Sequence, residues 1–198
     1  MNWVITPEKY LSEEEVKRLV NTCKDTAQLA KSKGNWIAVR DWAILDLALN
    51  TGLRVAEISN LKVDDLHLDY GEKSLTVRDG KGGKARVVKF GSEIKQHLNE
   101  YLDSRPEDSD YVFSSSRGEQ MSRSAIQKVV KKWMQEAGLP SHFSVHSLRH
   151  TYATKLLRVS GNNLRLVQKQ LGHSSVQTTQ VYADVTDTDV ENAVEKLT

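Results

Sequence analysis

Apolar residues recur at intervals of three and four over most of the chain, which is the spacing of helices with one buried face. Ser12 and Glu15 form a capping box ahead of the first run, so we expect a helix to begin near residue 12. The segment 36–49 is apolar on most faces, as in a buried central helix, and Gly52 stops it. Similar patterns predict further helices over residues 55–61, 145–159 and 164–171, through Ile94, Leu98 and Tyr101, through Ile126, Val129, Val130 and Trp133, and from Ser174 to Tyr182.

One segment alternates with a period of two instead. Leu75 and Val77 alternate with polar residues, a glycine-rich stretch interrupts the run at 80–83, and residues 85–88 resume it. This pattern predicts a β-hairpin with a basic tip, and residues 111–113 add a short extended piece. No internal repeat or linker divides the chain. We therefore expect a mainly α fold with a small antiparallel β-sheet (α+β), in a single catalytic domain spanning residues 1–198.

Composition places the chain among soluble globular proteins, because 38% of its 198 residues are hydrophobic and 27% are charged. It contains no run of eighteen apolar residues, and its first residues lack the layout of a signal peptide. We expect a cytoplasmic protein without membrane contact. The single cysteine, Cys23, cannot form an internal disulfide and is predicted to be a small buried hydrophobic residue.

The net charge is only +2, but the charges are segregated along the chain. No acidic residue lies between Glu136 and Asp184, and the segment 73–89 carries six Lys and Arg against one acid. The last segment, 184–198, carries five acids and one lysine. Such segregation is expected if two basic segments meet phosphates, although solvated helices can produce it as well.

Four short clusters contain the residues that could take part in a reaction. They are Thr51–Glu57, the hairpin tip with Lys81, His146–His150, and Leu171–His173 with Tyr182 nine residues further on. Together they supply guanidinium groups that match phosphate oxygens, imidazoles and a lysine that carry protons, and a tyrosine nucleophile. This set suits phosphoryl transfer without a metal or another cofactor. Taken singly, each residue also fits an ordinary surface or packing role.

In combination, these clusters resemble the tyrosine recombinases of the Xer and lambda-integrase type. The family pattern reads T-G-L-R-x-x-E, then G-K-G in a hairpin, H-x-L-R-H, L-G-H and a tyrosine, and the chain matches all of it in this order. The resemblance implies the tyrosine recombinase catalytic-domain fold. It also implies a site-specific DNA recombinase (integrase) that cleaves and rejoins strands through a covalent 3′-phosphotyrosyl intermediate. Integration, excision, inversion and dimer resolution stay open as outcomes.

The resemblance also assigns roles to individual residues. Tyr182 would be the nucleophile, Arg54 and Arg149 the phosphate clamp, His146 the acid/base partner of the tyrosine, and His173 a further donor to the phosphate. Lys81 would protonate the leaving 5′-oxygen, with Lys84 on the same hairpin as the alternative. Glu57 and His150 would support these groups, and no residue is expected to bind a metal. DNA contacts are expected from Lys84, Arg86, Lys155 and Arg165.

The expected partners are double-stranded DNA, further copies of the chain and accessory DNA-bending proteins. We expect a monomer in solution that forms a homo-tetramer on DNA. Val190, Ala193, Val194 and Leu197 recur at helical spacing, which predicts a tail helix within 184–198. In the family that the sequence resembles, this segment docks on the neighbouring protomer; folding back on its own domain is the alternative.

Family members also carry an N-terminal core-binding domain, whereas only eleven residues precede Ser12. An excised catalytic domain and a naturally short member both explain this difference. Three other functions compete with recombination: a metal-dependent hydrolase that uses His146, His150 and His173, a DNA-binding protein without the reaction, and a type IB topoisomerase. Ser147 stands where a zinc hydrolase of the H-E-x-x-H type would place its glutamate.

Overall fold

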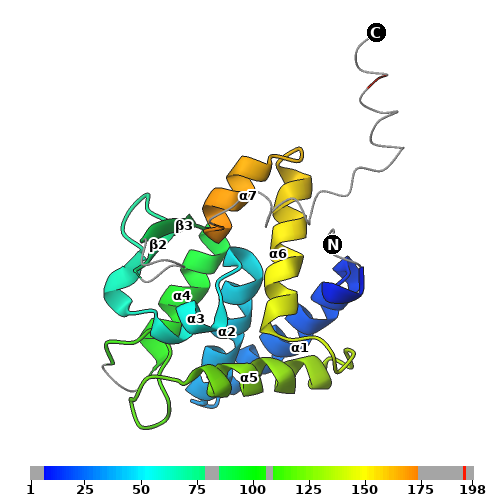
Figure 1. The fold of residues 1–198 in the computed structure, drawn as a ribbon. Helices are drawn as coiled ribbons and strands as arrows, with labels where there is room; N and C mark the ends of the chain where they lie inside the picture. The colour runs from blue at the N-terminus through cyan, green and yellow to red at the C-terminus, as the bar shows by residue number, and fades with distance from the viewer. Residues whose placement is uncertain (1–6, 79–84, 106–108, 174–193, 195–198) are drawn as a thin grey trace.

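The computed structural model describes residues 7–78, 85–105, 109–173 and 194, and within them it has seven α-helices and one three-stranded sheet (Figure 1). This confirms the predicted mainly α fold with a small antiparallel sheet. The helices are α1 (Glu13–Lys31), α2 (Trp36–Thr51), α3 (Val55–Asn60), α4 (Ser92–Ser104), α5 (Arg123–Glu136), α6 (Val145–Val159) and α7 (Leu164–Leu171). The strands are β1 (Leu66–His67), β2 (Ser74–Val77) and β3 (Arg86–Lys89), and the 3-10 helices are η1 (Pro7–Lys9) and η2 (Val63–Asp65).

Helix α2 is the centre of the molecule and packs against α1, α4, α5 and α6 (Figure 1). Every residue from Ala38 to Leu49 is buried, which explains why its sequence is apolar on nearly all faces. The side chain of Asn35 caps its first turn by accepting a hydrogen bond from the amide of Ile37 (3.2 Å). The predicted central helix is thus confirmed, and it extends to Thr51.

The sheet has the order β1-β2-β3 with both pairs antiparallel. Leu75 of β2 lies opposite Val88 on one side and Leu66 on the other, and both Leu75 and Val88 are fully buried. The two arms of the predicted hairpin are confirmed, whereas β1 was not predicted, because two residues are too few to show a periodicity. The hairpin tip with Lys81 and Lys84 lies outside the described residues.

Two apolar clusters hold the described elements together. The main one includes the fully buried Cys23, as predicted, and burial raises the pKa of its thiol. The second is small and joins only α6 and α7, through Ala153, Leu157, Val167 and Leu171. None of the described helices is both long and apolar enough to cross a membrane. The helix predicted up to Tyr182 and the tail helix lie outside the described residues, apart from Val194.

Candidate active site

The turn after α2 fixes the position of Arg54. Gly52 ends α2 with a left-handed backbone (φ +63°), and a Cβ there would lie 2.5 Å from Cδ1 of Tyr152 and 2.8 Å from Cδ2 of Leu171. A glycine is therefore required both by the backbone conformation and by the close approach of α6 and α7. Arg54 follows as the N-cap residue immediately before α3, and its side chain is 29% exposed.

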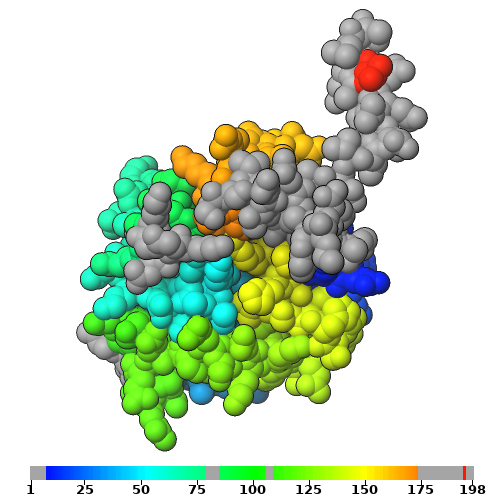
Figure 2. Space-filling model, viewed as in Figure 1, coloured from blue at the N-terminus to red at the C-terminus, as the bar shows by residue number. Residues whose placement is uncertain are grey.

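Arg149 joins three of the four sequence clusters. It lies in α6 and is nearly buried. Its Nη1 donates to the carbonyl oxygen of Gly52, and its Nη2 donates to the carbonyl oxygen of Leu171 (3.0 Å) and lies 3.0 Å from Nε2 of His173. One guanidinium thus ties the turn before Arg54 to the Leu-Gly-His turn after α7. Figure 2 shows the cyan segment beside the yellow surface of α6 on one face of the molecule.

Glu57 is a buried carboxylate held between two arginines. It accepts hydrogen bonds from the amide and Nη1 of Arg54 (both 2.8 Å) and from Nη1 and Nη2 of Arg86 (both 2.9 Å). Burial by itself raises the pKa of Glu57, but the hydrogen bonds and charges of Arg86 and Arg54 outweigh it and hold the pKa below its usual value. The carboxylate is therefore ionised at neutral pH. Glu57 therefore holds Arg54 in place through two hydrogen bonds, as a supporting residue would. Its effect on a reaction stays a prediction.

Arg86 was expected to contact DNA, but the structure turns its side chain inward. Both of its Nη atoms bind Glu57, and its side chain is only 11% exposed. One feature of the sequence does indicate this orientation. Residues two apart in a strand share a face, and Val88, two residues beyond Arg86, is one of the apolar residues that predict the hairpin.

His173 follows Gly172, which ends α7 in the left-handed conformation (φ +66°). Gln168 fixes this turn, because its carbonyl oxygen accepts from the amide of His173 (3.2 Å) and its Nε2 donates to the carbonyl oxygen of His173 (3.1 Å). Burial, followed by the charges of Arg149, Arg54 and Arg86, lowers the pKa of His173 to about 4. The imidazole is therefore neutral at neutral pH.

The other two histidines lie on α6 beside Arg149. His146 is in the first turn of the helix with an exposed side chain, one turn before Arg149. His150 is half-buried, and its pKa is lowered to about 4 by burial, followed by His146, Arg149 and Lys9. The His146 imidazole is thus open to solvent, whereas His150 is half-buried beside it, and the roles of both residues stay predictions.

The remaining predicted residues are not brought into this cluster by any described contact. Lys155 and Arg165 are exposed on α6 and α7, and Arg165 Nη1 donates to Oε1 of Gln168 on its own helix (3.3 Å). Lys81, Lys84 and Tyr182 lie outside the described residues. Across the part of the chain that the structure describes, no three His, Cys, Asp or Glu side chains are grouped so as to hold a metal ion.

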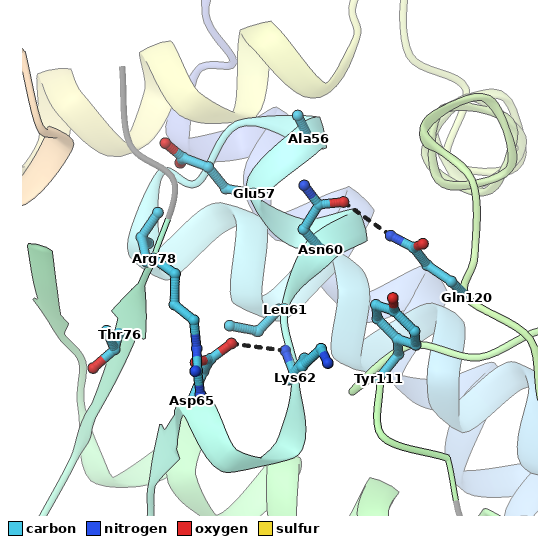
Figure 3. Close-up of a pocket in the computed structure, with 11 residues that line it drawn as sticks. Ala56, Glu57, Asn60, Leu61, Lys62, Asp65, Thr76, Arg78, Tyr111 and Gln120 are labelled. Carbon is cyan, nitrogen blue, oxygen red and sulfur yellow. Dashed lines mark hydrogen bonds and ion pairs between the residues drawn. The ribbon is translucent and has the colours of Figure 1, made fainter. Parts of the chain in front are cut away.

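A cavity of about 350 Å³ opens between α3 and β2, and Glu57 is one of the residues that line it (Figure 3). Its lining includes Lys62, Asp65, Arg78 and Tyr111, none of which the sequence singled out. Asp65 accepts from the amide of Lys62 (3.0 Å) and from Nε of Arg78, whose side chain is otherwise well exposed. The lining of the cavity thus carries charges of both signs, from Glu57 and Asp65 and from Lys62 and Arg78.

Solved structures with the same architecture are DNA recombinases. A crystal structure of XerA recombinase matches with a TM-score of 0.74 at 35% identity, over 95% of this chain and 65% of that chain. XerH recombinase bound to difH substrate in a pre-cleavage complex matches with a TM-score of 0.78 at 27% identity, over 96% of this chain and 55% of that chain. These matches place the fold among recombinase catalytic domains.

The chain belongs to the phage integrase family, whose model matches residues 9–189. It is similar to tyrosine recombinase XerA of Pyrococcus furiosus, with 38% identity over 95% of this chain and 61% of the relative. It is also similar to tyrosine recombinase XerD of Oceanobacillus iheyensis, with 39% identity over 89% of this chain and 57% of the relative. The chain thus spans about three fifths of the length of these relatives, and the predicted family is confirmed.

Proposed function

We propose that the chain is a tyrosine-type site-specific recombinase that cleaves and rejoins DNA through a covalent bond between Tyr182 and a 3′-phosphate. One observation carries the proposal: Arg149 binds both the turn that leads to Arg54 and the imidazole of His173. Three clusters that lie far apart in sequence therefore meet around one point. The family of the chain and the DNA complex of XerH add support.

In the proposed reaction, Arg54 and Arg149 bind the nonbridging oxygens of the scissile phosphate, where the charge of the transition state accumulates. The oxygen of Tyr182 attacks phosphorus and its proton passes to His146. The bond from phosphorus to the 5′-oxygen breaks, and that oxygen takes a proton from Lys81, with Lys84 as the alternative donor. His173 donates a hydrogen bond to the phosphate. A 5′-hydroxyl of the partner strand then attacks the phosphotyrosine and releases Tyr182.

The energy of the cleaved phosphodiester bond is conserved in the phosphotyrosine bond, so the proposed reaction needs no ATP. It needs no metal either, because the arginines stabilise the charge of the transition state. Exchange between two duplexes requires four active sites, and we propose a monomer that assembles as a homo-tetramer on double-stranded DNA. The tail helix would be exchanged between protomers, and accessory DNA-bending proteins would assist assembly. A DNA substrate in turn favours a cytoplasmic location.

Covalent capture tests the proposal. The protein is incubated with a pool of duplexes whose sequence is randomised on both sides of a nick. The nick releases the short fragment that carries the new 5′-hydroxyl, so the cut strand cannot be rejoined. DNA retained on the protein in detergent is then sequenced. We expect an enriched site with wild-type protein, none with Tyr182→Phe, and normal capture with Tyr70→Phe, which changes a fully exposed tyrosine. Capture by Tyr182→Phe would exclude Tyr182 as the nucleophile.

The same assay separates the recombinase from a metal-dependent hydrolase. Capture should persist in excess EDTA, since the proposed chemistry uses arginines where a hydrolase would use a metal ion. Loss of capture in EDTA that zinc or magnesium restores would favour the hydrolase instead.

A further inference from the structure

Within the part of the chain that the structure describes, the Glu57 carboxylate accepts its hydrogen bonds from two arginines in distant segments. Oε1 accepts from Nη1 of Arg54 (2.8 Å) and Nη1 of Arg86 (2.9 Å), and Oε2 accepts from the Arg54 amide (2.8 Å) and Nη2 of Arg86 (2.9 Å). The two Arg86 bonds form a bidentate pair, which fixes the orientation of both groups. Arg86 therefore determines where Glu57 lies, and Glu57 in turn holds Arg54.

The same Arg86 side chain is seated against the turn that precedes His173. A Cβ on Gly172 would lie 2.6 Å from Cδ, 2.7 Å from Nε and 2.9 Å from Cζ of Arg86. The Nε of Arg86 donates to the carbonyl oxygen of Gln170 (3.4 Å). The turn can approach this closely only because residue 172 has no side chain. Arg86 thus bridges the segment that carries Arg54 and the segment that carries His173.

The neighbouring backbone contacts keep this bridge in register. Gln170 accepts from the amide of Lys89 through Oε1 (3.3 Å) and donates to the carbonyl oxygen of the same residue through Nε2. The side chain of Gln170 therefore extends the sheet at the β3 edge and anchors α7 to it. Arg86 and Lys89 are the two ends of β3, so α7 is held at both ends of one strand.

We propose that Arg86 is a positioning residue that sets the distance between the Arg54 and His173 sides of the phosphate clamp, and that it does not bind DNA itself. The inference rests on the proposed recombinase function. Arg78 on the same hairpin shows the contrast: it also pairs with a buried carboxylate, Asp65, but 60% of its side chain is exposed, against 11% for Arg86. An arginine that met DNA from β3 would need its Nη groups turned outward.

The first test separates binding from cleavage. With the duplex found by covalent capture, the rate of adduct formation is measured at saturating DNA, and DNA affinity is measured over a range of salt. Arg86→Ala should cleave about 100-fold more slowly, because small displacements of a clamp cost that much. Its affinity should stay within about twofold, with an unchanged salt slope. A slope reduced by about 0.9 would mean a direct phosphate contact and would overturn the proposal.

Two further variants guard against a general loss of folding. Arg86→Lys keeps the charge but cannot bridge both oxygens of Glu57, so it should bind DNA normally and still cleave slowly. Arg105→Ala is the matched control. It removes a guanidinium that donates to the carbonyl oxygens of Tyr111 (2.7 Å) and Ser109 (2.9 Å), and it should lower stability without slowing cleavage at saturating DNA. Wild-type cleavage by Arg86→Lys would contradict the proposal.

A second readout needs no DNA and so stands even if recombination is not the function. The charge of Arg86 is one of the causes that keep the pKa of His173 low, whereas it is not among the causes for His150. In NMR titrations, Arg86→Ala should raise the pKa of His173 and leave that of His150 in place, and Arg86→Lys should keep both low. An unchanged His173 in folded Arg86→Ala would show that Arg86 does not hold this turn.

Discussion

Arg149 Nη2 lies 3.0 Å from His173 Nε2, although 24 positions separate the two residues in the sequence. A guanidinium has only donors, so Nε2 of His173 must accept and the ring proton lies on Nδ1. Burial, then Arg149, Arg54, Arg86 and His150, lowers the pKa of this imidazole to about 4. Before DNA binds, the site is therefore too buried and too positive for His173 to carry a charge at neutral pH.

The arrival of a phosphate should reverse this effect. A phosphate near the arginines neutralises them and favours imidazolium, so the pKa of His173 should rise on DNA binding. Protons are then taken up, and affinity should increase as the pH falls from 7 toward 4, below which both states are protonated. Calorimetry near about pH 5.5 in two buffers of different ionisation enthalpy measures this uptake. His173→Gln should remove most of it and His150→Gln much less; equal losses would contradict the assignment.

Gly52→Ala should disrupt the site from the turn after α2. The left-handed backbone costs an alanine about 1–2 kcal/mol, and overpacking against Tyr152 adds about 1–3 kcal/mol to the loss in unfolding free energy. Gly34→Ala is the matched control, since Gly34 is also left-handed (φ +72°) but has no atom within 4 Å of an added Cβ. Denaturant titration compares the two. Equal losses would mean that the contact with Tyr152 yields without cost.

Lys155 and Arg165 test the basic segment of the chain. Both are exposed, and neither is held by a carboxylate in any described contact. If each meets a phosphate, Lys155→Ala and Arg165→Ala should each reduce the slope of log affinity against log salt by about 0.9. Lys31→Ala, on α1 and paired with Glu100, is the control with an unchanged slope. Unchanged slopes in both test variants would remove this surface from the DNA interface.

Deletion of residues 188–198 tests the proposed exchange of the tail. Val194 is 55% exposed, and each buried aliphatic side chain of the tail would contribute about 1.5–3 kcal/mol on a partner. The truncated protein should bind a single site almost normally but lose cooperative assembly and recombination, as gel shift and strand-exchange assays would measure. A truncated protein without a thermal unfolding transition would instead show that the tail packs on its own domain.

Most of the helices were predictable because the apolar pattern repeats over two or more turns, whereas the short α3 was predicted as the segment that follows the Gly52 turn. The apolar residues of the segment 36–49 predict that α2 is buried on nearly all faces, and Gly52 predicts where the helix ends. Strand β1 was not predictable, because it has only two residues and is defined by its pairing with β2 in the folded sheet. The motif residues Arg54, Arg149 and His173 were predictable from the resemblance, but only the structure shows that Arg149 is hydrogen-bonded to Gly52 and lies 3.0 Å from His173. The inward position of Arg86 depends on strand register, which its sequence neighbours only indicate.

The small apolar cluster between α6 and α7 has a consequence for motion. Leu157, Val167 and their neighbours are separate from the main core, so α7 is fastened to the sheet chiefly by polar groups such as Gln170. Segments with few buried apolar contacts open locally at a lower free energy than the whole domain. Amide hydrogens of α7 should therefore exchange well before those of α2. Each such opening would separate His173 from Arg149. The site would then be inactive although the other helices remain folded.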